Sequence, residues 1–248
     1  MAGHSKWANI KHRKSRQDAK RGKQWSKCSR AIIVAARNGG GDPKFNTTLR
    51  YAIDDAKAVN MPKDTIEKAI KKGDGGADGE QYEEVRYEGY GPGGVAVLID
   101  CLIANVNKAA AEIRSIFDKN NGKMGVQGSV AFGFTQQGVF LIEHGRIDED
   151  RLMEVALEAG ADDVTSDPDG GWQVTCDPSS FHGVKDALEG AEIELASAEV
   201  TNTPQTMVDC NTKIGVQILR LVDALEDLDD VQKVYTNAEI PAEAYEQL

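Results

Sequence analysis

The sequence has few of the residues that covalent frameworks and membrane anchors require. Its four cysteines, Cys28, Cys101, Cys176 and Cys210, lie far apart and form no C-x-x-C pair. This argues against zinc knuckles and a disulfide framework and favours a reducing cytosol. No stretch approaches the roughly 20 apolar residues of a membrane-spanning helix, and the N-terminus lacks the apolar core of a secretory signal. We therefore expect a cytoplasmic protein without a membrane anchor.

Motifs that would carry catalysis are also missing. The sequence contains no G-x-S-x-G string and no local Cys–His signature, so it indicates no nucleophilic site. The glycine-rich string GYGPGG precedes a strand pattern rather than a helix, which favours a hairpin turn over a phosphate-binding loop. The histidines form no metal-binding cluster; they are His4, His12, His144 and His182. We expect no catalytic residue, no metal site and no cofactor.

Positive charge is concentrated at one end of an otherwise acidic chain. The sequence holds 29 Lys and Arg against 40 Asp and Glu, a formal net charge of −11. Residues 1–72 have 18 basic and 6 acidic residues, a net of +12, whereas residues 73–248 have a net charge of −23. Such segregation indicates parts with different partners, and we expect the basic part to bind a polyanion, with nucleic acid as the first candidate.

The N-terminal charges are ordered along a predicted helix, residues 15–38, that ends at three glycines. At about 100° per residue, its apolar side consists of Trp25, Cys28, Ile32 and Ala35. The opposite side presents a cationic stripe, which consists of Arg16, Lys20, Lys23, Lys27 and Arg30. Lysine and arginine at this spacing can follow phosphates, although a solvated helix face is the simpler alternative. Because the stripe faces away from the apolar side, we expect glutamates at positions 20, 23 and 27 to leave the fold intact.

The tail before this helix continues the charge and adds an aromatic ring. Its candidate nucleic-acid contacts are Lys6, Trp7, Lys11, His12, Arg13 and Lys14. Trp7 either stacks on a base or packs under the helix. The acidic remainder of the chain is repelled by the same polyanion, so we expect it to face away from the stripe or to meet a protein partner.

Two further helices complete a small N-terminal bundle in this interpretation. The second has helical apolar spacing, at Phe45, Leu49, Ala52, Ile53, Ala56 and Val59. The third begins near Pro62 and stops at Gly73, and the run at 73–80 is predicted to be a linker.

Beyond the linker the period changes to that of strands. Residues 138–203 read as β-α-β-β-α-β, the ferredoxin-like order. Residues 95–134 and 205–236 each read as β-α-β, with SVAFGF and TMVDC as strands, and together would form a second such module. The predicted class is α+β, with a three-helix domain followed by two ferredoxin-like α/β domains, one inserted in the other. The predicted domains are 1–73, 74–136 with 204–248, and 137–203.

Several strings resemble those of the YebC family of bacterial proteins, whose mitochondrial relatives activate translation of cytochrome c oxidase subunit I. The strings are AGHSKWANIKHRKSRQDAKRGK, NGGGDP, NMPKDTIEKAIKKG, YEGYGPGGVAVLIDCL, GSVAF, ALEAGADDV and LEDLDDVQKVY. The likeness covers nearly the whole chain and implies the same three-domain layout. The chain departs from the family where Thr47 and Thr48 replace a usual Pro-Arg pair, and where Gln24 and Trp25 replace an apolar-aromatic pair.

We interpret the protein as a nucleic-acid-binding regulator of gene expression that acts by occupancy. The resemblance implies either a DNA-binding transcriptional regulator or a translation factor that acts on ribosomes stalled at consecutive prolines. No helix-turn-helix is indicated, because the glycine-rich connection exceeds the expected turn, and backbone contacts suit structured RNA as well as DNA. The alternatives are an enzyme such as a nuclease, a small-molecule sensor that uses a sheet edge, and a structural scaffold.

Overall fold

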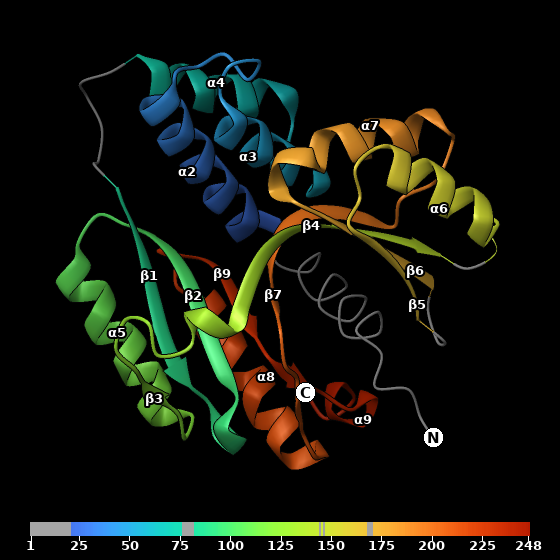
Figure 1. Ribbon diagram of the computed structural model, residues 1–248. Coiled ribbons are helices and arrows are strands. Elements are labelled where there is room, and N and C mark those ends of the chain that lie inside the picture. Colours follow the sequence, from blue (N-terminus) through green and yellow to red (C-terminus); the bar gives the residue numbers. More distant parts are fainter. Residues whose placement is uncertain (1–20, 76–81, 144, 146, 168–170) are drawn as a thin grey trace.

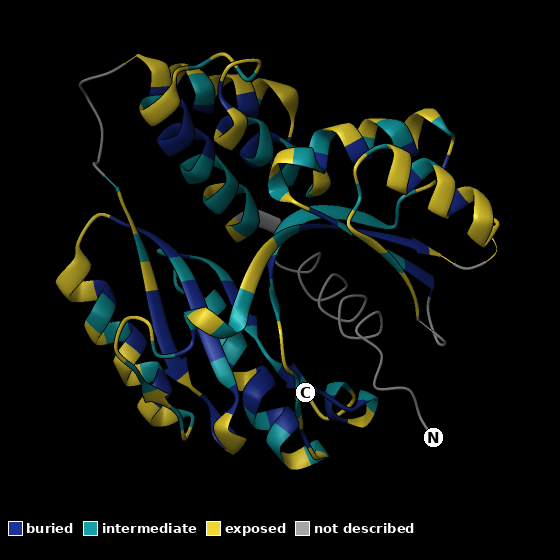
Figure 2. Ribbon diagram, viewed as in Figure 1, coloured by how far each residue is buried: buried dark blue, intermediate teal, exposed yellow. Residues whose placement is uncertain are grey.

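Figure 1 shows the computed structural model, which describes residues 21–75, 82–143, 145, 147–167 and 171–248. Three helices at the upper left of this view lie above one α/β part and beside a second, which is at the right. Figure 2 shows that buried residues follow the inner sides of the helices and the central strands. No helix within the described ranges is long and apolar enough to cross a membrane.

The helical domain consists of α2 (Arg21–Gly39), α3 (Thr47–Ala58) and α4 (Lys63–Asp74). Its core contains Ile32, Leu49, Ala56 and Ile66, and Trp25 and Cys28 pack against this core from the predicted apolar side of α2. The indole nitrogen of Trp25 donates to the Val59 carbonyl at 3.1 Å.

One residue assigned to this core lies elsewhere. Phe45 belongs to the turn before α3 and is 88% exposed. The predicted apolar face of the second helix therefore began too early in the sequence. The helix begins later because Asn46 is its N-cap, with the Asn46 side chain accepting from the Leu49 amide.

The first α/β part is a four-stranded sheet in the order β3-β1-β2-β9. Its strands are β1 (Glu83–Tyr90), β2 (Ala96–Ile103), β3 (Lys123–Met124) and β9 (Val231–Thr236). The string GYGPGG is the turn of the antiparallel β1–β2 hairpin, as predicted. Its helices are α5 (Val106–Lys119), which Asn105 caps, and α8 (Thr212–Glu226). Both helices contribute to one core with the sheet.

Two strands of this sheet, β2 and β9, are those that the sequence predicted for the module, but the other two are different. TMVDC supplies only β8 (Val208–Asp209), which pairs with β10 (Ala238–Glu239) in a separate sheet. The predicted strand SVAFGF is a loop with a short 3-10 turn, because backbone N–H groups there bind the Glu88 carboxylate. The place of TMVDC is taken by β1, which precedes the module in sequence. The strand order remains ferredoxin-like with one strand permuted.

The inserted part has the predicted β-α-β-β-α-β order. It consists of β4 (Phe134–Glu143), α6 (Glu149–Glu158), β5 (Asp163–Asp167), β6 (Gly171–Cys176), α7 (Phe181–Gly190) and β7 (Ser197–Pro204). The antiparallel sheet has the order β5-β6-β4-β7. Phe140, Leu152 and Phe181 are buried in its core. The predicted fold class, helices followed by α/β domains, is confirmed.

Candidate nucleic-acid interface

The three stripe residues that the structure describes contact the C-terminal end of α8 and the residues that follow it, although Lys23 also stays exposed to solvent. Lys27 Nζ donates to the Glu226 carbonyl at 2.6 Å. Lys23 Nζ lies 3.2 Å from the Asp227 carbonyl and 3.5 Å from its carboxylate. The remaining stripe residues, Arg16 and Lys20, lie outside the described residues, as do the tail candidates from Lys6 to Lys14.

Arg30 has the largest set of partners in this contact. Its Nη1 lies 3.1 Å from the Leu102 carbonyl, 2.9 Å from the Asp229 carbonyl and 2.8 Å from the Asp230 carboxylate. The guanidinium also lies over the Tyr82 ring, 4.7 Å from its centroid. The Arg30 side chain is only 20% exposed, so this contact is largely withdrawn from water.

The last carbonyls of a helix lack partners within the helix and carry a partial negative charge. The acidic residues that follow α8 strengthen this attraction for cations. Burial lowers the pKa of Lys27, although Glu226 and Asp229 oppose this shift. The expectation that the acidic part faces away from the stripe is therefore wrong for Lys23, Lys27 and Arg30. Glutamates at positions 23 and 27 would disturb packing between domains.

A second set of contacts joins α3 to the inserted part. Tyr51 stacks on His182 with ring centroids 5.0 Å apart, and its hydroxyl hydrogen bonds to the Pro178 carbonyl. Asp54 lies 3.5 Å from Lys185 and 3.7 Å from His182. His182 is thus part of an interface between domains, where burial lowers its pKa.

Lys233 on β9 connects all three parts of the molecule. Its Nζ lies 3.0 Å from the Asp55 carboxylate of α3 and 3.5 Å from the Glu199 carboxylate of β7. Burial alone would lower the pKa of Lys233, but the two carboxylates raise it above its ordinary value. Lys233 therefore stays protonated at neutral pH and holds the helical domain against both sheets.

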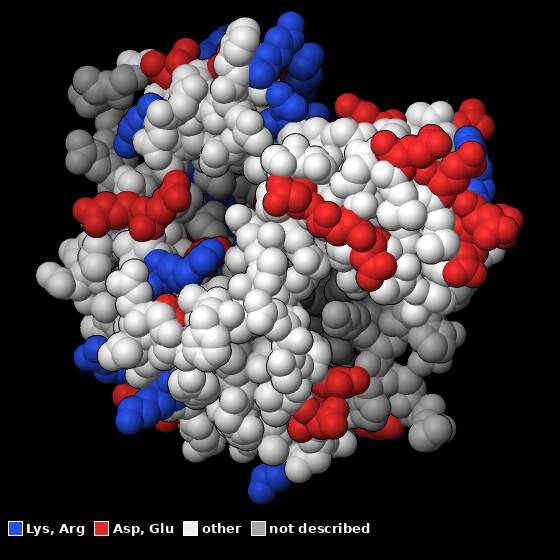
Figure 3. All heavy atoms as spheres, viewed as in Figure 1, with Lys and Arg blue, Asp and Glu red and all other residues white. Residues whose placement is uncertain are grey.

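The outer surface of the helical domain carries a different set of cations. These exposed lysines are Lys44, Lys57, Lys63, Lys68, Lys71 and Lys72. Figure 3 shows Lys and Arg gathered at the top of the molecule, whereas Asp and Glu dominate the inserted part at the right. These lysines were not among the nucleic-acid contacts predicted from the sequence. The helical spacing of Lys68, Lys71 and Lys72, opposite the buried Ile66 and Ala69, was the signal that could have identified them.

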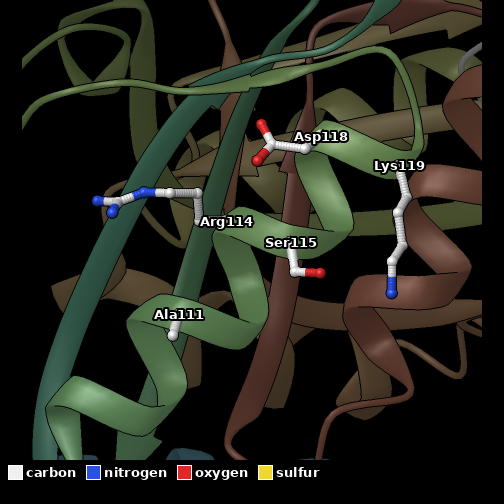
Figure 4. A pocket seen from close by; sticks show the side chains of 5 residues that line it. All are labelled: Ala111, Arg114, Ser115, Asp118 and Lys119. Atoms are coloured by element: carbon white, nitrogen blue, oxygen red, sulfur yellow. The ribbon is translucent and has the colours of Figure 1, made fainter.

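The described residues show little that resembles a catalytic centre. Burial raises the pKa of Cys28 to about 11 and that of Cys101 to about 12, so both thiols are protonated at neutral pH. No group of His, Cys, Asp and Glu within the described ranges could hold a metal ion. A surface hollow of about 460 Å³ on α5 is lined by Ala111, Arg114, Ser115, Asp118 and Lys119. Figure 4 shows that Arg114 and Lys119 point in different directions rather than toward a common centre.

These features define a class of protein in which a basic helical domain is fixed to two acidic α/β domains. Residues 5–76 match the family model described as the TACO1/YebC protein N-terminal domain, and residues 82–238 match the TACO1/YebC second and third domain. The chain therefore belongs to the TACO1/YebC family, as the resemblance implied.

Relatives of similar length carry a common description. The chain is 53% identical to a "probable transcriptional regulatory protein" of Rhodopirellula baltica, over 98% of this chain and 99% of the relative. It is 53% identical to a protein of the same description from Halorhodospira halophila, with complete coverage of both chains. The crystal structure of a conserved hypothetical protein from Aquifex aeolicus is similar, with a TM-score of 0.77 and 42% identity over 90% of this chain and 92% of that one.

Proposed function

We propose that this protein is a non-enzymatic regulator of gene expression that binds DNA through its basic helical domain and acts in the cytoplasm. The observation that carries the proposal is the row of exposed lysines on α4, a helix at the top of the molecule, where Figure 3 shows Lys and Arg gathered. Phosphate contacts of this kind release condensed counterions and dominate affinity. The family relatives described as probable transcriptional regulatory proteins support the same assignment.

The proposed contact surface combines two sets of residues. The first is the N-terminal set from the sequence, which consists of Lys6, Trp7, Lys11, His12, Arg13, Lys14, Arg16 and Lys20. The second is Lys44, Lys68, Lys71 and Lys72 on the described surface. We assign Lys23, Lys27 and Arg30 to the contact with α8, and we retain the domains 1–73, 74–136 with 204–248, and 137–203.

A charge-reversal experiment tests the surface. In the first variant, Glu replaces Lys68, Lys71 and Lys72. In the matched control, Glu replaces three exposed lysines of the first α/β part, Lys108, Lys119 and Lys123. The two variants change the net charge equally. Fluorescence anisotropy measures the affinity for a labelled DNA duplex and for a labelled RNA hairpin. Only the α4 variant should lose affinity, at least tenfold, and the dependence of its affinity on salt concentration should become shallower by about one unit of slope per lost phosphate contact. Equal losses in both variants, or no binding by the wild type, would overturn the proposal.

A second candidate is a ribosome-associated translation factor that contacts RNA and relieves stalls at consecutive prolines. It is favoured by the connection between α2 and α3, which runs from 40 to 46. A DNA-reading helix-turn-helix uses a turn of about three to four residues. Crosslinking in cells, followed by sequencing of bound DNA and RNA, distinguishes the candidates. Promoter DNA would support transcriptional control, whereas ribosomal RNA would support the translation factor.

A further inference from the structure

The turn between α2 and α3 presents an aromatic ring to solvent. Phe45 is 88% exposed, more than Phe132 at 78% or Val126 at 77%. Figure 1 shows this light-blue turn at the top of the molecule, beyond the helices and remote from both sheets. An apolar ring in this position contributes little to folding, because it covers no core.

Hydrogen bonds on both sides of the ring hold the turn in place. The amides of Phe45 and Asn46 each lie 3.1 Å from the Asp42 carbonyl, and the Lys44 amide lies 2.9 Å from the Asp42 carboxylate. The buried Asn46 amide group donates to the Ala35 carbonyl at 2.8 Å and the Gly40 carbonyl at 2.9 Å. The backbone that carries Phe45 is therefore fixed before any partner arrives, which reduces the entropy lost on binding.

Cations occur in this turn and on the two helices that contact it. Lys44 precedes the ring, and Arg50 of α3 donates through Nε to the Pro43 carbonyl at 3.2 Å. The last turn of α4, with Lys71 and Lys72, meets the same turn where the Gly41 amide donates to the Asp74 carboxylate at 2.9 Å. The four cations are accompanied by two carboxylates, those of Asp42 and Asp74, and each carboxylate accepts a backbone N–H. The local charge is positive.

We propose that Phe45 is a stacking platform for an unpaired base, and that the ligand of this end of the helical domain is single-stranded or looped nucleic acid. This inference rests on the proposed function and adds the structural class of its ligand. Base stacking on an aromatic ring tolerates every base, while adjacent cations hold the flanking phosphates. A base within a continuous duplex is stacked on its neighbours and is not available to the ring.

Substitution at the ring tests the inference in the full-length protein. The probes are a labelled RNA hairpin with an unpaired loop, a labelled oligothymidylate and a blunt DNA duplex. Phe45→Ala and Phe45→Leu should lower the affinity for the hairpin and oligothymidylate at least fivefold, which corresponds to the loss of one stacked base, and leave duplex binding unchanged. Phe45→Trp should bind at least as tightly as the wild type, because a larger ring is retained.

Phe132→Ala is the matched control, because it removes another exposed ring, 78% accessible, from the first α/β part. It should leave binding to all three probes unchanged. The inference is overturned if Phe45→Ala binds the looped probes normally or loses duplex affinity to the same extent. It is also overturned if Phe45→Leu retains full affinity, because an apolar side chain without a ring would then suffice, as in a contact with a protein or with a second copy of the chain. Failure of the proposed function gives a different result, since the wild type would then bind none of the probes.

Discussion

Glu88 illustrates how one buried carboxylate can organise a loop. Glu88 is only 3% exposed. Its carboxylate oxygens accept hydrogen bonds from the backbone amides of Gly128 at 2.6 Å, Val130 at 2.7 Å and Ala131 at 2.8 Å. Burial of Glu88 opposes ionisation, but the three N–H groups together outweigh it, so its pKa lies below its ordinary value of 4.5. This interaction explains why the segment that reads as a strand in the sequence is a loop.

Replacing this carboxylate by an amide should destabilise the protein. Glu88→Gln presents an NH₂ group to backbone donors, and we expect the free energy of unfolding to fall by about 2–3 kcal/mol at neutral pH. Because the native pKa is depressed, the stabilisation is present above pH 4.5 and disappears as the pH falls through the lower native value. Urea unfolding between pH 7 and pH 3 measures the difference between the two proteins in free energy of unfolding, which should shrink only below about pH 4.5.

Glu84→Gln serves as the control for this prediction, since Glu84 is an exposed residue of the same strand. Its effect should stay within about 0.5 kcal/mol. A Glu88→Gln protein as stable as the control at pH 7 would show that the three amides do not depend on the charge.

At the scale of elements, the contact of α2 with the end of α8 makes a prediction about domain docking. Arg30→Met removes the charge and the donors that reach Leu102, Asp229 and Asp230 while keeping an apolar chain. We expect the free energy of unfolding to fall by about 2 kcal/mol, since partly buried acceptors are left without a donor. Hydrogen exchange should accelerate along α2 and the residues that follow α8, and remain unchanged in the inserted sheet.

Lys63→Met is the matched substitution on α4, where the side chain is 88% exposed. It should alter neither stability nor exchange measurably. If Arg30→Met behaved like Lys63→Met, the helical domain would be held by its other contacts, such as those of Lys27 with Glu226 and of Tyr51 with His182.

Most elements could be predicted from sequence, because local signals determine them. Asn105 caps α5, the glycine-rich turn closes the β1–β2 hairpin, and the inserted sheet follows its predicted order. The short strands β3 and β10, and the pairing of β8 with β10, could not be predicted, since they depend on distant partners. For the same reason no periodic pattern could place Glu88 against the amides of 128–131. Phe45 was misassigned because the N-cap Asn46 competes with apolar spacing as a start signal.

The whole molecule is held together by charges from its separate parts. Lys233 lies between Asp55 and Glu199, and the cationic stripe of α2 meets the acidic end of α8. The sequence showed that positive and negative charge are segregated, but it could not show that part of the positive set is neutralised within the chain. That pairing depends on how two domains dock. Within the described residues of the helical domain, it leaves the lysines of α4 more accessible than Lys27 and Arg30 of the stripe.

Charge segregation also affects how fast a polyanion reaches the helical domain. The exposed carboxylates of α6 repel an approaching nucleic acid, so neutralising Glu149, Asp150 and Glu158 to their amides should raise the association rate about twofold at low salt. The dissociation rate should stay unchanged, because these residues lie on the inserted part, remote from α4. Stopped-flow anisotropy measures both rates, and the gain should vanish at high ionic strength. A gain that persisted in high salt, or that appeared in the dissociation rate, would indicate that α6 touches the bound nucleic acid directly.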